Sequence, residues 1–86
     1  MSQSNEPDGA KPRPSSSKQI DRAIGAQINA ARKKKGLTTD IVAEHIGLEK
    51  YDFEKIESGE LRATAEVLFQ LSKYLGVVVS FFYENI

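Results

Sequence analysis

The segment from Gly36 to Gly59 constrains the fold of this chain more than any other stretch. Thr38 is typical of a helix N-cap, and Asp40 in the following turn suits the positive end of a helix dipole. Gly47 can end that helix and allow a tight turn, and Gly59 can close a second helix. The segment therefore predicts two short helices joined by a glycine turn.

Apolar side chains recur at helical spacing on both short helices and predict which faces they bury. Leu48 is expected to anchor the turn in the core. The aromatic rings of Phe53, Phe69 and Tyr74 are expected to pack in or near the core, since nothing arranges them as a ladder of stacking platforms. The predicted buried positions of the two short helices are Ile41, Val42, Ala43, Ile46, Phe53 and Ile56.

Amphipathic segments flank this pair of helices. Residues 18 to 35 have apolar side chains at helical spacing and a basic run at the end. Thr64 can cap another helix that stops at Gly76. Residues 77 to 86 predict a short fifth helix, capped by Ser80, because a lone strand would have no partner. The apolar positions of the two long flanking helices are Ile20, Ile24, Ile28, Ala31, Val67, Leu68, Leu71 and Leu75.

Residues 1 to 17 are rich in Ser, Pro, Gly and charged residues and contain almost no large apolar side chain. Such a segment cannot offset its ordering entropy by burial. We therefore expect a disordered tail over residues 1–17 and one folded domain over residues 18–86. Lys11 and Arg13 could let the tail follow DNA, whereas Glu6 and Asp8 cancel their charge and favour a solvated extension.

Composition excludes several classes of protein. The 86 residues suit one small domain, and their formal net charge is zero. Without cysteine and with only His45, neither a disulfide nor a metal cluster is expected. No nucleophile with a base and no glycine-rich phosphate loop is evident, so we predict no enzyme, no cofactor and no small-molecule ligand. No apolar run approaches a membrane span, and a cytoplasmic location is expected.

Together these residues resemble the Cro/cI-type, or XRE-family, helix-turn-helix transcriptional regulators over about residues 20 to 83. The resemblance implies an all-α, compact, five-helix phage-repressor-like DNA-binding domain whose third helix enters the major groove of double-stranded DNA. It also implies a homodimer that reads paired half-sites. The residues at the family's signature positions are Ile28, Arg32, Gly36, Leu37, Thr38, Val42, Ala43, Ile46, Gly47, Leu48, Ile56, Glu57, Ser58, Gly59, Leu71, Leu75, Gly76 and Val77.

The resemblance also implies which residues touch DNA. Lys50 and Lys55 suit guanine acceptors, and Glu54 could accept a hydrogen bond from cytosine N4. The base-reading candidates are Lys50, Tyr51, Glu54 and Lys55. The phosphate candidates are Thr38, Thr39, Arg32, Ser58 and Arg62, of which Thr39 replaces the family's usual glutamine and has a shorter reach.

Arg32 and Glu57 match a recurrent ion pair of the family, which joins the first helix to the end of the third. The pair can be a structural brace alone, or a brace whose outer edge also meets a phosphate. The lysines at 33 to 35 leave a similar choice between a solvated helix end and added phosphate contacts.

The predicted third helix departs from the family in its charge. Glu49 stands at the usual Ser/Thr cap, and Asp52 replaces a small residue. Both carboxylates would repel phosphate, although pairing of Lys50 with Glu54, and packing of Tyr51 on Lys55, would neutralise part of the surface. The alternative function is a protein-interaction module of the same fold, such as an antitoxin-like partner or accessory subunit, with weak or no DNA binding.

The C-terminal segment is more apolar than one short helix can bury. A symmetric dimer would cover it, through Val79, Phe82, Tyr83 and Ile86. In the alternative arrangement, Phe81 and Phe82 close the base of the monomer core and leave only Tyr83 and Ile86 outside.

Overall fold

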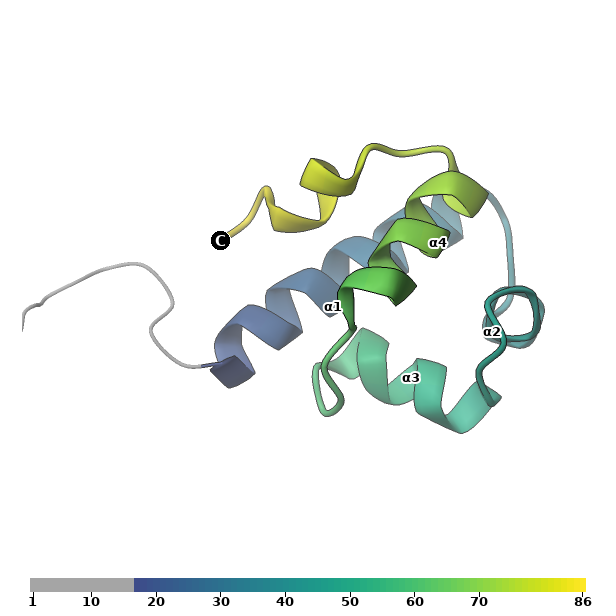
Figure 1. The fold of residues 1–86 in the computed structure, drawn as a ribbon, viewed down its shortest axis with the longest axis horizontal. Coiled ribbons are helices and arrows are strands. Elements are labelled where there is room, and N and C mark those ends of the chain that lie inside the picture. The colour runs from purple at the N-terminus through teal and green to yellow at the C-terminus, as the bar shows by residue number, and fades with distance from the viewer. Residues whose placement is uncertain (1–16) are drawn as a thin grey trace, which may run out of the picture.

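A computed structural model describes residues 17–86 of the chain. These residues form four α-helices and a C-terminal 3-10 helix, with no strand among them (Figure 1). The predicted all-α fold with five helices is therefore confirmed, with a tighter fifth helix than expected. The elements are α1 (Ser17–Lys34), α2 (Thr39–His45), α3 (Lys50–Ser58), α4 (Ala65–Leu75) and η1 (Val79–Tyr83).

The predicted tail falls almost wholly outside the described residues. Its last residue, Ser17, is the first residue of α1, so the helix begins one position earlier than expected. Residues 1–16, including Lys11 and Arg13, are not described by the structure. The prediction for the tail consequently stays a prediction.

Helix ends follow the signals in the sequence. The Thr38 side chain accepts a hydrogen bond from the Ile41 N–H at 3.3 Å, and the Thr64 side chain accepts one from the Val67 N–H at 3.2 Å. Gly47 has a φ of +77°, a left-handed conformation that glycine adopts without a steric cost. The turn between α2 and α3 therefore depends on that glycine.

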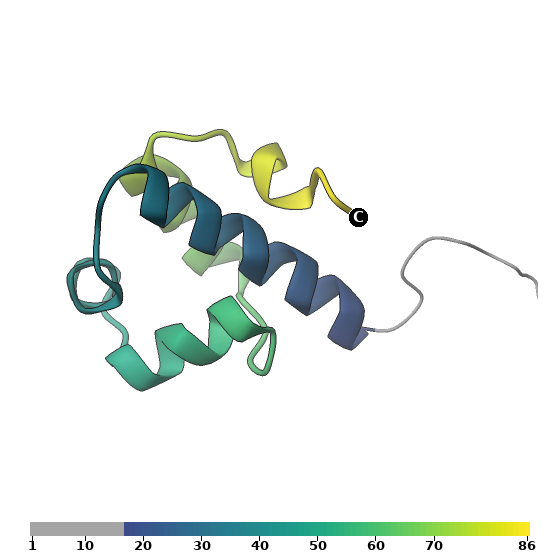
Figure 2. The ribbon, with the colours of Figure 1, turned by 180° about the vertical axis from the view of Figure 1, so that it is seen from behind.

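The long helix α1 lies between α3 on one side and η1 on the other, as both views show (Figure 1, Figure 2). Every element contributes to a single core, and η1 closes it with a completely buried phenylalanine, Phe82. The largest fully buried side chains are Phe53, Phe82, Ile28, Leu71 and Val42. The core thus holds α3 firmly from its inner side.

α1 and the end of α3 approach each other unusually closely at Gly25. A Cβ atom at this position would lie 2.5 Å from the Glu57 carbonyl oxygen and 2.8 Å from the carbonyl carbon, distances that real Cβ atoms do not show. The role of Gly25 is not visible in the sequence, because it depends on a neighbour more than 30 residues away. Gly25 sets the separation of the two helices.

Two apolar side chains that were expected in or near the core are exposed. Ile41 is 47% exposed, because the buried face of α2 is narrow and consists of Val42, Ala43 and Ile46. Phe69 is 54% exposed on the outer face of α4, with the Lys73 ammonium 5.2 Å from its ring centre.

The N-cap of η1 is Val78 rather than Ser80, since the helix begins before the serine. Tyr74 does pack against the core, and its ring also stacks on His45 with centroids 3.7 Å apart. None of the helices within residues 17–86 combines the length and apolar character needed to cross a membrane.

Candidate nucleic-acid interface

α3 has one buried face and one outward face. Phe53 and Ile56 are buried in the core, as predicted, and they fix the rotation of the helix. The four predicted base-reading residues occupy positions i, i+1, i+4 and i+5, which share a single face of an α-helix. Three of them are exposed and Lys55 is half-buried. The structure therefore brings all four predicted residues to one side of the domain.

Two pairings predicted along α3 are present. The Lys50 ammonium lies 3.9 Å from Glu54 Oε2, and the Lys55 ammonium lies 4.5 Å from the centre of the Tyr51 ring. Tyr51 and Lys55 also line an open hollow of about 280 Å³. The first pair brings opposite charges together, whereas the second leaves a cation against an aromatic face.

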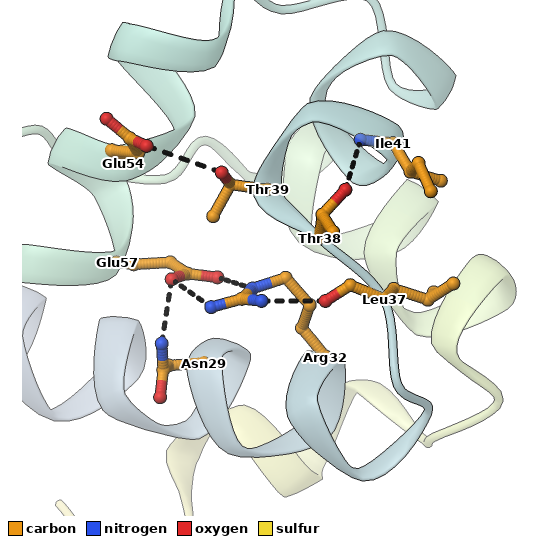
Figure 3. A network of polar contacts seen from close by, with 8 residues as sticks. All are labelled: Asn29, Arg32, Leu37, Thr38, Thr39, Ile41, Glu54 and Glu57. Carbon is orange, nitrogen blue, oxygen red and sulfur yellow. Dashed lines mark hydrogen bonds and ion pairs between the residues drawn. The ribbon is translucent and has the colours of Figure 1, made fainter.

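α2 contributes a further contact that the sequence did not predict. Asp40 Oδ1 lies 3.6 Å from the Lys50 ammonium. The Thr39 hydroxyl donates a hydrogen bond of 3.3 Å to Glu54 Oε2, as Figure 3 shows. These contacts join the two helices of the helix-turn-helix at their exposed edge. Thr39, a predicted phosphate contact, is therefore already bonded within the protein.

Arg32 and Glu57 form the predicted ion pair, and it is almost enclosed. The Arg32 Nε donates to Glu57 Oε2 at 2.7 Å and Nη2 donates to Oε1 at 3.2 Å, while Nη1 donates to the Leu37 carbonyl at 2.7 Å. The two side chains are only 10% and 9% exposed. The guanidinium thus fixes α1, α3 and the loop before α2 relative to one another.

Burial favours the first of the two interpretations of this pair. A guanidinium that is nine-tenths buried and bonded on three nitrogens exposes little of its outer edge, which favours a structural brace, and the contact of Arg32 with phosphate stays a prediction. Asn29 completes the brace by donating to Glu57 Oε1 at 2.8 Å (Figure 3). Its position one helical turn before Arg32 was the available signal in the sequence.

Ser58 and Arg62 lie at and after the end of α3. The Ser58 hydroxyl donates to the Lys55 carbonyl at 3.0 Å, and the Arg62 Nε lies 3.2 Å from Asp21 Oδ1 at the start of α1. The Arg62 side chain is largely exposed, whereas that of Asp21 is largely buried. Asp21 therefore holds the arginine by one nitrogen and leaves the rest of its guanidinium in solvent.

Two lysines at the end of α1 lie near the end of α4. Lys34 and Lys35 line a groove of about 540 Å³ together with Leu75 and Val77, at the end of α4. α3 does not line this groove. Whether these lysines also contact phosphate stays a prediction.

The C-terminal segment combines a buried and an exposed part. Phe82 is completely buried and closes the monomer core. The prediction that it forms part of a dimer interface is therefore wrong. Val79, Tyr83 and Ile86 remain exposed. Gln27 fixes the segment on α1 by donating to the Phe81 carbonyl at 2.8 Å.

Comparison with known proteins agrees with this geometry. No family model matches the chain. Two uncharacterised HTH-type transcriptional regulators, from Sinorhizobium medicae and Rhizobium meliloti, are each 33% identical to it over 66 residues, or 77% of this chain. The match covers 48% of each relative, so the chain spans about half the length of the curated relatives it matches.

Solved structures share the fold. The clp gene regulator ClgR from Corynebacterium glutamicum superimposes with a TM-score of 0.75 at 24% identity, over 86% of this chain and 74% of that protein. An HTH_3 family transcriptional regulator from Vibrio cholerae gives a TM-score of 0.72 at 28% identity, over 81% of this chain and 39% of its own. The chain therefore has a helix-turn-helix fold similar to that of these transcriptional regulators, in agreement with the Cro/cI-type (XRE) resemblance of its signature residues.

Proposed function

We propose that this chain is a transcriptional regulator that binds double-stranded DNA in a sequence-specific manner. The observation that carries the proposal is the outward face of α3, where Lys50, Tyr51, Glu54 and Lys55 project together while Phe53 and Ile56 anchor the helix from behind. Its similarity to HTH-type transcriptional regulators supports the same function.

In this proposal α3 enters the major groove. Lys50 and Lys55 donate hydrogen bonds to guanine O6 and N7, and Glu54 accepts one from cytosine N4. The N-terminus of α2 at Thr38, together with Ser58 and Arg62, contacts phosphates and sets the position of the helix without reading sequence. The buried Arg32 and Glu57 pair orients α3.

We further propose that the chain acts in the cytoplasm as a homodimer. The apolar side chains of Val79, Tyr83 and Ile86 are exposed on the C-terminal segment, and a symmetric interface would bury them. Two α3 helices would then read half-sites separated by about one turn of DNA. Sedimentation of wild type and of a Tyr83→Ser, Ile86→Ser double variant measures whether these residues hold two copies together.

The function is tested by incubating the purified chain with genomic fragments at low salt and sequencing the bound fraction. A shared motif in the bound fragments is the expected result, with affinity that falls steeply as salt rises. Enrichment equal to that of bulk DNA would contradict the proposal.

Substitutions on α3 separate base reading from phosphate contact. Lys50→Ala and Lys55→Ala should each weaken binding by roughly 5-fold to 100-fold and change the preferred sequence. Arg62→Ala should weaken binding to all sequences alike and lower the dependence of affinity on salt. Competition assays with the selected duplex and a scrambled duplex of equal length measure both effects.

The acidic residues of α3 favour the second candidate function, a protein-interaction module. Residues 49 to 58 contain two lysines and four carboxylates, and Lys50 is engaged by two carboxylates. If the selection yields no motif, and Lys55→Ala leaves DNA binding unchanged, this second function becomes the better explanation of the fold.

A further inference from the structure

The two lysines on the outward face of α3 have different electrostatic surroundings. The Lys50 ammonium lies 3.6 Å from Asp40 Oδ1 and 3.9 Å from Glu54 Oε2, so one cation is shared by two carboxylates. Lys55 lies over the Tyr51 ring, and no carboxylate of the described residues is within ion-pair distance of it. A polyanion therefore meets Lys55 without a competing carboxylate, whereas Lys50 is already paired with two carboxylates.

Glu54 is held in place by more than its charge. Its Oε2 accepts the hydrogen bond from the Thr39 hydroxyl at 3.3 Å (Figure 3). The same oxygen faces the Lys50 ammonium. The carboxylate consequently bridges α2 and α3 at the open edge of the helix-turn-helix. We call the three charged side chains Asp40, Lys50 and Glu54 the acidic clamp.

The acidic clamp is open to solvent. The side chains of Asp40, Lys50 and Glu54 are 66%, 54% and 47% exposed, in contrast to the enclosed Arg32 and Glu57 pair. Exposed ion pairs are weak, so a phosphate or a base can compete for the Lys50 ammonium. The clamp is therefore an exchangeable contact and not a structural brace.

Exchange leaves two carboxylates beside DNA. Once Lys50 turns to the duplex, Asp40 and Glu54 remain without their cation near phosphate charge. This cost is the same for every sequence unless a base donates a hydrogen bond to the carboxylate, and cytosine N4 is the major-groove donor that a glutamate prefers. A duplex with cytosine opposite Glu54 therefore offsets more of the cost than a duplex without it.

We propose that the acidic clamp is a discriminator, in which Glu54 suppresses binding to non-cognate DNA by competing for Lys50 and releases it when cytosine is opposite. The inference rests on the proposed function and adds to it a reason why an acidic residue stands in the recognition surface. Asp40, on α2, weakens binding to all duplexes alike, because in the proposed docking the first turn of α2 faces phosphates.

The test compares Glu54→Gln and Asp40→Asn with wild type on two duplexes, the one enriched from genomic fragments and a scrambled one of equal length. Glutamine retains an oxygen that can accept the Thr39 hydrogen bond, so the helices should stay joined. Glu84→Gln removes the same charge at the end of η1, on the other side of α1 from α3 (Figure 1). Sedimentation confirms that all variants share one oligomeric state.

Glu54→Gln should bind the scrambled duplex roughly three- to fivefold more tightly at low salt, and the ratio of the two affinities should fall by about the same factor. Asp40→Asn should tighten both complexes with little change in the ratio. Glu84→Gln should leave both affinities within about twofold of wild type, because screening attenuates a distant charge.

If wild type selects a motif but Glu54→Gln binds both duplexes as Glu84→Gln does, the discriminator is wrong and the proposed function stands. If wild type enriches no motif, the variants are compared with it on two unrelated duplexes of equal length. Binding by Glu54→Gln alone would then support competition for Lys50 but would overturn its release by cytosine, and DNA binding by the wild-type chain would fail as well. If no variant binds either duplex, both proposals are wrong.

Discussion

The two ends of α3 are joined to the rest of the domain by ion pairs of opposite character. At its C-terminal end Glu57 meets Arg32 and Asn29 in an almost closed site, 9% to 10% exposed for the two charged residues. At its N-terminal end Lys50 meets Asp40 and Glu54 in solvent. The enclosed end can orient the helix because nothing competes for its hydrogen bonds. The exposed end can exchange partners, and that is the property a reading surface requires.

The largest expected effect comes from breaking the enclosed pair. Arg32→Ala should lower the free energy of unfolding by about 3–5 kcal/mol, because it leaves the Glu57 carboxylate buried without its cation. Urea denaturation measures the loss. Arg62→Ala is the matched control, since it removes an arginine from an exposed pair and should cost about 0–1 kcal/mol. Equal losses from the two substitutions would show that burial does not distinguish the pairs.

Gly25→Ala tests the close packing at the same end of α3. On an isolated helix this substitution would stabilise by about 1 kcal/mol through helix propensity. Here the added Cβ clashes with the backbone of Ile56 and Glu57, so we expect the free energy of unfolding to fall by about 1–3 kcal/mol. Thermal denaturation measures this change. Ala26→Gly, at the exposed neighbouring position, should cost only the propensity difference. A gain in stability for Gly25→Ala would mean that the two helices separate easily.

The smallest expected effect lies at the exposed end. Glu49 is the N-cap of α3, and its side chain makes no capping hydrogen bond. Glu49→Ser should stabilise the domain by about 0.5–1 kcal/mol, since the oxygen of a serine hydroxyl can accept a hydrogen bond from a free backbone N–H of the first turn. Glu49→Gln separates capping from charge, and it should raise affinity for DNA with little change in stability. If serine gives no increase in the denaturation midpoint over glutamine, capping does not limit this helix.

Local signals in the sequence predicted much of the fold. Thr38 and Thr64 cap helices as expected, and the α1 boundary differs from its prediction by one residue. These signals succeed because a cap or a glycine turn depends on atoms within about one helical turn. The outward face of α3 followed from the inward positions of Phe53 and Ile56 alone.

Predictions failed where an apolar side chain could lie either in the core or on the surface of the folded domain. Ile41 and Phe69 are apolar and stand on amphipathic helices, yet both side chains are exposed to solvent. Phe82 was expected to face another subunit, but the space beneath η1 admits it completely. In each case the apolar residue was correctly recognised, and its direction depended on where other elements lie.

The amino-acid sequence by itself determined the number and order of the helices, the ends of α2, α3 and α4, and the face of α3 that turns away from the core. Only the tertiary structure decided that Gly25 lies against α3, that Asn29 completes the Arg32 and Glu57 brace, and that Asp40 of α2 reaches Lys50. The physical reason is the distance along the chain over which each interaction acts. Caps, turns and periodicity are set by neighbours along the chain, whereas these three contacts exist only once packing has brought distant segments within a few ångströms.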